Sequence, residues 1–422
     1  MSEPVREFDV IVVGAGMVGS LFALLLVQDA AAQGLRVAII DGERSTLPPA
    51  DAPFDLRVSA LTRASEALIA RAGCGDALNS QRHCRFTNMQ VWDADGTGAV
   101  HFSAGDAGAS HLGTLIENRI LQAVLADKLF ATAAAKVTAT TAAPAQPAAL
   151  TVLCPARVHS LSRELSGWQV TLADGQRLRA PLLIGADGAQ SRVRAAAGIA
   201  VQTRDYDQHG LVCTVTTEQP HQATAWQRFL PAGPLAFLPL ADPHQCSIVW
   251  TLPSADLPEL LALNDADFAS RLGIAFEHRL GAITAVGPRA AFPLQARHAE
   301  RYTQDALALI GDAAHSIHPL AGQGLNLGLL DAGALADEML AALRSGLPAG
   351  HARALSRYSR QRRGDNSLML HTMTGFERLF ASDDLHLRIL RNTGMRLFDR
   401  SGPLKALVMR SAMGLNMSSK LN

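Results

Sequence analysis

Three separated segments of the chain each pair glycines with a carboxylate at the end of an apolar run. They are Gly14-x-Gly16-x-x-Gly19 with Asp41 further on, Asp187-Gly188, and Gly311-Asp312. Glycines admit close approach of the backbone to a ligand, a carboxylate accepts hydrogen bonds from hydroxyls, and a helix N-terminus offers free N–H groups. These residue types predict a binding site for a ligand that carries both phosphates and sugar hydroxyls.

The first segment has the surroundings of a dinucleotide-binding turn. The elements predicted around it are a buried strand, a helix and a second strand, at residues 9–13, about 18–32 and 36–40. In this motif Gly14 permits the tight turn, Gly16 lets the backbone approach a pyrophosphate, and Gly19 lets the helix pack on the strand. Met17 and Val18 lie between these glycines and are included among the predicted cofactor-binding residues.

Asp41 ends the second predicted strand, about 20 residues after the glycine turn, where it would accept hydrogen bonds from both hydroxyls of an adenosine ribose. A carboxylate at this place would repel a 2′-phosphate, so the sequence favours FAD or NAD over NADP. The alternative is that Asp41 is an ordinary strand-end turn residue before Gly42.

The other two corners repeat the pattern of an apolar strand that stops at an acid. Residues 182–185 lead to Asp187-Gly188 and a helix near Ser191, and residues 307–310 lead to Gly311-Asp312 and a glycine-rich loop. Each corner alone also fits a capped turn between a strand and a helix. Three such corners in one chain favour a single shared nucleotide site.

Composition narrows the function classes. The 422 residues carry no net charge and only 18% are charged, so no global field points to nucleic acid. Five cysteines without a C-x-x-C pair fit a reducing cytoplasm better than a disulfide framework. Glycines interrupt the apolar run 10–27 and acidic residues precede it, which favours a strand, a turn and a helix over a membrane span.

Residues 211–293 change to aromatic and alternating segments that are typical of a sheet. We expect this sheet to cover the first domain and to form the ceiling of an apolar pocket. The predicted lining residues are Phe237, Pro239, Trp250 and Phe292, although each also fits an ordinary core position. Residues 131–149 are rich in Ala, Thr and Pro and lack core periodicity, so we expect a surface insertion.

The domain order expected from these patterns interleaves two folding units and ends in helices. The dinucleotide-binding unit takes residues 1–75, 109–200 and 296–345, the β-rich unit takes 76–108 and 201–295, and a helical region takes 346–422. No second G-x-G-x-x-G occurs, so a nicotinamide nucleotide would dock transiently and has no domain of its own.

The three motifs together resemble the signature of the single-component flavin-dependent aromatic hydroxylases, the para-hydroxybenzoate hydroxylase type. The segment His318–Gly328 is similar to the narrower family of ubiquinone-biosynthesis hydroxylases, as are residues 55–61, 111–118 and 237–250. The likeness runs from about Asp9 to Asn416. It implies an α/β fold with a Rossmann-like FAD-binding domain, an inserted β-rich substrate domain and a C-terminal helical region.

The resemblance also implies which residues hold FAD. Arg57 would contact FAD near the pyrophosphate, Asn118 would lie against the flavin, and Asp312 would bind the ribityl chain. Asp187 with Gly188 would serve FAD and the encounter with NAD(P)H. The residues that would lie against the isoalloxazine ring are Pro319, Gly322, Gln323, Gly324, Leu325 and Asn326, at a helix N-terminus that stabilises negative charge.

The implied reaction is hydroxylation of a polyprenylphenol ring at its fifth carbon, with NAD(P)H and O2, through a flavin C4a-hydroperoxide. This chemistry is carried by the flavin and needs neither a protein nucleophile nor a metal. His315 and His318 are spaced i, i+3 beside the flavin loop, and each is either a structural histidine or a proton relay. The alternatives are another ring position, another aromatic substrate, or a redox-silent lipid-binding or assembly subunit of a ubiquinone-synthesis complex.

The C-terminal part is rich in Leu, Met and Phe, and a group of arginines precedes it. These are Arg357, Arg360, Arg362 and Arg363. Two interpretations stay open: helices that pack on the body with their arginines in solvent, or an amphipathic surface for a membrane or a partner. We expect a cytoplasmic protein, with peripheral contact at the inner membrane and homo-oligomerisation left open.

Overall fold

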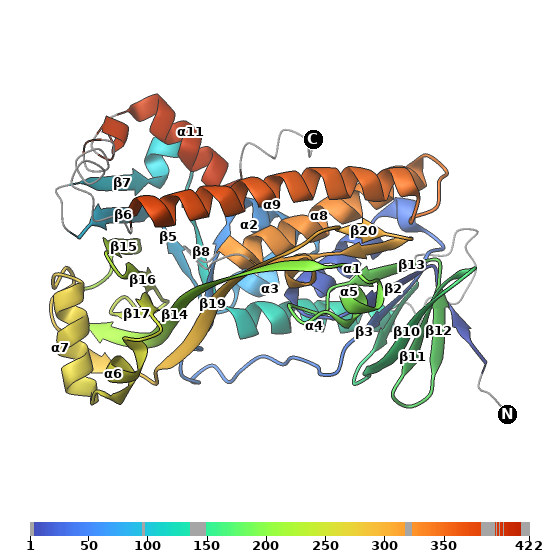
Figure 1. Cartoon of the computed structure of the whole chain (residues 1–422), viewed down its shortest axis with the longest axis horizontal. Helices are drawn as coiled ribbons and strands as arrows, with labels where there is room; N and C mark the ends of the chain where they lie inside the picture. Colours follow the sequence, from blue (N-terminus) through green and yellow to red (C-terminus); the bar gives the residue numbers. More distant parts are fainter. Residues whose placement is uncertain are drawn as a thin grey trace.

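The computed structural model describes residues 4–94, 98–135, 149–316 and 323–380, together with 393, 395, 397–399 and 401–414. Figure 1 shows an elongated molecule in which two long C-terminal helices lie along one side. These helices are α8 (Gln323–Arg344) and α9 (Ala352–Phe380). The predicted α/β class with a second, β-rich part is confirmed.

A six-stranded sheet forms the centre of the dinucleotide-binding part. Its order is β20 (Thr303–Gln304), β21 (Leu307–Leu309), β13 (Leu182–Gly185), β2 (Val10–Val13), β3 (Arg36–Ile40) and β9 (Ala149–Leu153), and all pairs from β21 to β9 are parallel. Every residue of β2 and β13 is buried, because the sheet is covered on both faces.

Helices cover one face of this sheet and a smaller sheet covers the other (Figure 1). The helices are α1 (Met17–Val27), α4 (Asn118–Ala135) and α8, and α1 contacts both of the others. The smaller sheet has the order β1 (Arg6–Glu7), β12 (Arg177–Ala180), β11 (Gly167–Leu172) and β10 (Val158–Glu164). The core between these layers is aliphatic, with Leu21, Ile39 and Ile184 fully buried.

A nine-stranded sheet forms the second part of the molecule. Its path is β22 (His315–Ser316), β19 (Ala290–Ala299), β14 (Val201–Thr217), β17 (Gln245–Pro253), β16 (Gly233–Pro239), β15 (Thr224–Leu230), β6 (Asn88–Asp93) and β7 (Ala99–Ser103), and β18 (Ile283–Val286) pairs with β14. Helices α6 (Leu257–Ala262) and α7 (Asp265–Ala275) lie by this sheet (Figure 1). Residues from β6 and β7, far earlier in the chain, therefore complete a sheet built by residues 201–316.

A three-stranded sheet connects the two parts. It contains β4 (Val58–Thr62), β8 (Gly113–Glu117) and β5 (Cys84–Phe86), and it is followed along the chain by α2 (Arg63–Arg71) after β4 and by α4 after β8. Thr62 caps α2 by accepting a hydrogen bond from the Ser65 N–H. The sheet thus reaches from the dinucleotide-binding part to the nine-stranded sheet.

Two sequence-based boundaries are corrected by the structure. The first helix ends at Val27, and a separate 3-10 turn follows at Ala30–Ala32, because Asp29 caps that turn with its side chain. The expected insertion 131–149 is shorter than predicted: α4 continues to Ala135, and Ala149 begins β9, an edge strand of the central sheet. Residues 136–148 lie outside the described part of the chain.

Candidate active site

The glycine turn between β2 and α1 is shaped by close backbone packing. Gly14 has φ +100°, and a Cβ at this position would collide with the Ala186 carbonyl. A Cβ on Gly19 would collide with the Gly14 carbonyl, which is the close contact between helix and strand that this motif requires. By contrast, a Cβ on Gly16 would meet nothing within 4 Å. Protein atoms therefore pack closely against Gly14 and Gly19, whereas the space beside Gly16 is free for a ligand.

Asp41 lies against this turn. Its carboxylate accepts hydrogen bonds from the Ala15 N–H at 2.5 Å and from the Glu43 N–H at 3.1 Å. Gly16 is the N-cap residue of helix α1 and has no side chain to cap it, so the first N–H groups of the helix remain available for an anion. A carboxylate next to free helix N–H groups matches a ligand that presents hydroxyls beside a pyrophosphate.

The three predicted acids lie at the same edge of the central sheet. Asp312, Asp187 and Asp41 follow the carboxyl ends of β21, β13 and β3, with β2 and its glycine turn between the last two. Neighbouring strands are about 4.8 Å apart, so β21 and β3 are separated by about 14 Å. That span is shorter than an extended dinucleotide, and one such ligand can therefore reach all three corners.

Asp187 acts as a cap for its own helix. Its carboxylate accepts hydrogen bonds from the Ser191 hydroxyl at 2.5 Å, from the Arg192 N–H at 2.7 Å and from the Val193 N–H at 3.1 Å. These residues open the short helix α5 (Arg192–Ala196). The Asp187 side chain therefore caps the turn between strand and helix, which was the alternative interpretation of this corner. Contact between FAD and this corner stays a prediction.

Asp312 is supported from behind by a buried charged cluster. The Asp331 carboxylate accepts hydrogen bonds from the Gly311 N–H at 3.1 Å, from His315 Nε2 at 2.5 Å and from Arg362 Nε at 2.7 Å. The side chains of Asp331, His315 and Arg362 are all essentially inaccessible. We call these three residues the buried cluster. It fixes the turn that carries Asp312.

The charges in the buried cluster are mutually stabilising. Burial alone would raise the pKa of Asp331, but the His315 ring and the Arg362 guanidinium hold that pKa below its ordinary value. One interpretation of the sequence placed Arg362 on a face exposed to solvent, and the structure shows that it is buried. His315 is a buried structural partner of Asp331, and its Nδ1 has no hydrogen-bond partner among the described residues.

The Asp312 side chain is exposed, yet protein surrounds it closely enough to alter its acidity. Desolvation raises its pKa above the ordinary value, against the opposing effect of His315 and Arg57. A carboxylate that is both accessible and partly desolvated is suited to accepting hydrogen bonds from ligand hydroxyls.

Arg57 and Asn118 reach the same region from the connecting sheet. The Asn118 N–H donates to the Arg57 carbonyl at 2.9 Å, and the Arg57 guanidinium lies 4.9 Å from the centroid of the Phe292 ring. Among the described residues the Asn118 side-chain oxygen is buried and has no hydrogen-bond partner. An unpaired buried oxygen at this point favours a donor supplied by a ligand.

Glu117 holds this arm in place. Its buried carboxylate accepts hydrogen bonds from the Asp55 N–H at 2.7 Å, from Arg82 Nε at 2.6 Å and from the Arg119 guanidinium at 2.7 Å. Although burial opposes ionisation, these donors hold the pKa of Glu117 below its ordinary value. The segment that carries Arg57 is thereby tied to the start of α4, where Asn118 lies.

The start of α8 is braced by Asn326. Its side chain, 1% exposed, accepts hydrogen bonds from the Thr62 N–H and the Ser65 hydroxyl and donates to the Ala60 carbonyl. Asn326 thus anchors the helix N-terminus to β4 and α2, while Gly324 and Leu325 are partly exposed beside it. Four predicted positions lie wholly or partly outside the described residues: Pro319, Gly322, His318 and the side chain of Gln323.

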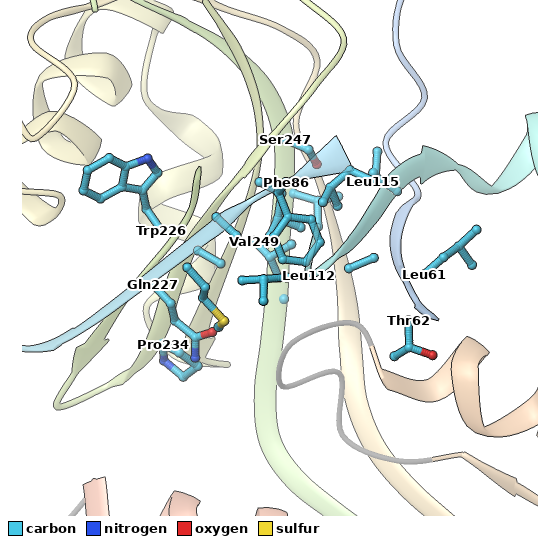
Figure 2. Close-up of a pocket in the computed structure, with 18 of the residues that line it drawn as sticks. Leu61, Thr62, Phe86, Leu112, Leu115, Trp226, Gln227, Pro234, Ser247 and Val249 are labelled. Carbon is cyan, nitrogen blue, oxygen red and sulfur yellow. The ribbon is translucent and has the colours of Figure 1, made fainter. Parts of the chain in front are cut away.

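An apolar cavity of about 520 Å³ lies between the connecting sheet and the nine-stranded sheet. Figure 2 shows Leu61, Thr62 and Leu115 on the right of the view and Gln227 on the left, with Phe86, Leu112 and Val249 between them. Arg57, Thr62 and Asn118 also line it, and Arg57 is close enough to influence the pKa of Asp312, so this end of the cavity lies toward the Asp312 corner. Helix α11 (Gly402–Ala412) completes the wall with Val408, Met409, Ala412 and the following Met413.

Of the four aromatic and proline residues predicted to line a pocket, only Phe292 does so. Phe237 and Trp250 are buried in the core on the other face of the sheet, where Phe237 stacks on Phe276 at 3.7 Å. Pro239 shares that orientation, since it alternates along β16 with Leu238, which lines the cavity. Period-two alternation sends the smaller Ala236 and Leu238 into the cavity, and the prediction had selected the wrong face.

These features fit FAD better than a metal. The open Gly16, the uncapped start of α1, Asp41, the accessible Asp312 and the unpaired Asn118 oxygen match the phosphates, hydroxyls and ring of a flavin dinucleotide. Within the described residues no group of three or more His, Cys, Asp or Glu side chains is arranged to hold a metal ion. A flavin dinucleotide site beside a cavity is the arrangement expected of a flavin-dependent redox enzyme.

Comparison with known proteins identifies the family. Residues 7–369 match the model of the FAD binding domain family, FAD_binding_3. The chain is 39% identical over 406 residues to ubiquinone hydroxylase UbiL of Rhodospirillum rubrum, which covers 96% of this chain and 89% of that protein. It is 36% identical over 407 residues to 3-demethoxyubiquinol 3-hydroxylase of Escherichia coli, with 96% and 98% covered.

Solved structures agree on the fold. Pseudomonas aeruginosa PqsL in complex with 2-aminobenzoylacetate superposes with a TM-score of 0.74 at 22% identity, over 92% of this chain and 99% of that one. p-Nitrophenol 4-monooxygenase PnpA of Pseudomonas putida gives 0.71 at 19% identity, over 98% of each chain. The chain belongs to the FAD-dependent hydroxylases of ubiquinone biosynthesis, and the predicted family, enzyme class and FAD cofactor are confirmed.

Sequence reasoning missed several residues of the site. Asp331 and Arg362 stand alone in helical sequence, and only their burial in the fold reveals that they are paired. Met409 and Met413 are spaced i, i+4 in the C-terminal region, a spacing that is also typical of ordinary core residues. Only the position of α11 against the cavity shows that they line it. Gln227 could have been found from the sequence, because it is a polar residue within a strand whose neighbours are mostly apolar.

Proposed function

We propose that this protein hydroxylates the aromatic ring of a polyprenylphenol at its fifth carbon, using NAD(P)H and O2. The observation that supports this most is the apolar cavity next to the three acid–glycine corners. The relatives described above include a ubiquinone hydroxylase and a 3-demethoxyubiquinol 3-hydroxylase, and this chain is similar to them over nearly its whole length. FAD supplies the oxygen-activating chemistry when it is bound.

The extent of the cavity supports a substrate with a long apolar tail. Its lining crosses seven neighbouring strands, from Phe292 on β19 to Phe102 on β7. With about 4.8 Å between strands, the path along the sheet from β19 to β7 is about 29 Å. A phenol alone needs only a small part of this length, and the remainder is lined mainly by Leu, Val, Met and Ala side chains.

The residues of this chain would divide the work as follows. The uncapped α1 turn, Asp41 and Asp312 bind the FAD dinucleotide, and Arg57 and Asn118 lie where cavity and cofactor meet. The α8 N-terminus, braced by Asn326, offers positive dipole toward the flavin. The apolar walls of the cavity would limit contact between water and the reacting ring.

The cavity rim suggests how an apolar substrate arrives. Leu407 is 56% and Val408 42% exposed on α11, and Val408 also lines the cavity. We propose peripheral contact between this rim and a membrane that holds the prenylated substrate. In the described part of the chain, every helix is too short or too polar to cross a bilayer.

The test is to incubate the FAD-loaded protein with a short-tailed prenylphenol, NAD(P)H and O2, and to determine the ring position of any new hydroxyl by NMR. We expect substrate-dependent oxidation of NAD(P)H and a hydroxyl on the fifth ring carbon. If the new hydroxyl is on another ring carbon, the protein is still a hydroxylase but the proposed ring position is wrong. Binding of the prenylphenol without any turnover would reject the enzyme proposal in favour of a lipid-binding or assembly role.

A further inference from the structure

Gln227 is a buried amide that faces the apolar cavity. It is 7% exposed and lies on β15 between Trp226 and Arg228, which point to the opposite face. Figure 2 shows the Trp226 ring directed away from the other labelled cavity residues, with Gln227 among them. The strand register places Gln227 opposite Ala236 on β16, and Ala236 opposite Val249 on β17.

The row of residues that contains Gln227 is otherwise apolar. Cross-strand partners share one face of a sheet, so Gln227, Ala236, Val249 and Val212 form a line across the cavity floor. Two strand spacings separate Gln227 from Val249, or about 10 Å. The amide is thus the one polar side chain in the central row of this floor, within the part of the chain that the structure describes.

The Gln227 side chain makes no hydrogen bond within the described residues, although its backbone is paired on both sides. Even the exposed Gln28 has a protein partner: its amide donates to the Ala72 carbonyl at 3.0 Å. The amide atoms of Gln227 are not among the fully buried, unpaired side-chain atoms, so they reach the cavity surface. An amide there that meets neither water nor a ligand would cost about 1–3 kcal/mol. A packing role would be filled more favourably by Leu or Met, so the amide points to a partner that enters the cavity.

We propose that Gln227 is a specificity-determining residue that hydrogen-bonds an oxygen substituent of the substrate ring other than the phenol hydroxyl. The amide offers both a donor and an acceptor, so it can pair with a hydroxyl or an alkoxy oxygen. A hydrocarbon tail cannot satisfy it, and the tail therefore lies along the apolar neighbours Met89, Phe102 and Met409. This inference rests on the proposed function, since it assigns one contact of that substrate.

The experiment compares two short-tailed prenylphenols that differ only in one additional ring methoxy or hydroxyl group. Their dissociation constants are measured from the change in the FAD absorption spectrum on binding, without NAD(P)H, for the unaltered protein and for Gln227→Met. We expect the variant to bind the oxygen-substituted phenol about 10-fold more weakly or worse, since about 1.4 kcal/mol corresponds to tenfold. Binding of the other phenol should change by less than about threefold.

Leu238→Met is the matched control, because it alters the shape of the same cavity floor without changing its polarity. It should change both dissociation constants by the same factor. The unaltered protein should itself bind the oxygen-substituted phenol about tenfold more tightly than the other phenol. This second measurement tests the proposal even if Gln227→Met does not fold.

Equal weakening of both phenols in Gln227→Met, or no preference in the unaltered protein, would overturn the assignment of Gln227 while leaving the proposed function intact. If neither phenol binds to the unaltered FAD-loaded protein, the proposed function itself fails and this inference fails with it.

Discussion

The dinucleotide corner and the apolar cavity lie side by side but are assembled in different ways. The corner is made by four neighbouring parallel strands whose ends carry glycines and acids, each specified within a few residues of sequence. The cavity is made by seven strands of one sheet, three of another and a C-terminal helix, drawn from residues 56 to 413. Local motifs thus define the cofactor site, whereas long-range packing defines the substrate site.

The largest effect should come from breaking the buried cluster behind the cofactor corner. Asp331→Asn leaves Arg362, which is 1% exposed, without its main counter-charge, and we expect a loss of about 3–5 kcal/mol in the free energy of unfolding. Urea denaturation measures this. Asp337→Asn is the control on the same helix, because its half-exposed ion pair with Arg71 should contribute no more than about 1 kcal/mol. Equal losses in the two variants would show that the cluster has no special role.

Gly16→Ala should separate cofactor binding from folding. The added Cβ meets no protein atom within 4 Å, so we expect stability within about 0.5 kcal/mol of the unaltered protein. FAD affinity should fall about tenfold or more, because the pyrophosphate must approach this backbone closely. Fluorescence titration of the FAD-free protein gives the affinity. Gly34→Ala, at φ +78°, should show the reverse: a stability loss of about 1 kcal/mol and unchanged FAD affinity.

The contrast between the two regions also explains what the sequence could reveal. The strand 36–40 was predicted with the same bounds as β3, and the three acids fell at one sheet edge, because period, glycine spacing and strand-end position are local properties. The sequence could not show whether Phe237 and Trp250 point into the cavity or into the core on the other side of the sheet, because both faces of β16 and β17 carry apolar residues. The partnership of Asp331 with Arg362 joins residues 31 apart on two helices, and only tertiary packing brings them together.

The cavity side of the comparison is tested by reducing its volume. Ala236→Phe places an aromatic ring on the cavity floor, and we expect the KM for a prenylphenol to rise about tenfold with FAD affinity unchanged. Steady-state kinetics and FAD titration measure the two quantities. Ala285→Phe, at an exposed position on β18, is the control and should alter neither. A changed FAD affinity in Ala236→Phe would mean that the two regions are not independent.

The smallest effect concerns acid stability. The pKa values of Asp331 and Glu117 are lower in the folded protein than their ordinary values of 3.8 and 4.5. Their contribution to stability is therefore complete above those ordinary values and is lost as the pH falls through the lower, folded values. Urea midpoints measured between pH 7 and pH 3 should decline mainly below about pH 4.5, and Glu117→Gln should decline less steeply. A decline that begins near pH 6 would point to histidines instead.

The central claim is that bound FAD directs oxygen from O2 into a phenol held in the apolar cavity. The most direct measurement is mass spectrometry of the product formed by the FAD-loaded protein from a prenylphenol and NAD(P)H under 18O2. We predict one 18O atom in the product ring and none when H2 18O is the only labelled species. A product labelled from water, or NAD(P)H oxidation that yields only hydrogen peroxide with every prenylphenol tried, would contradict the account.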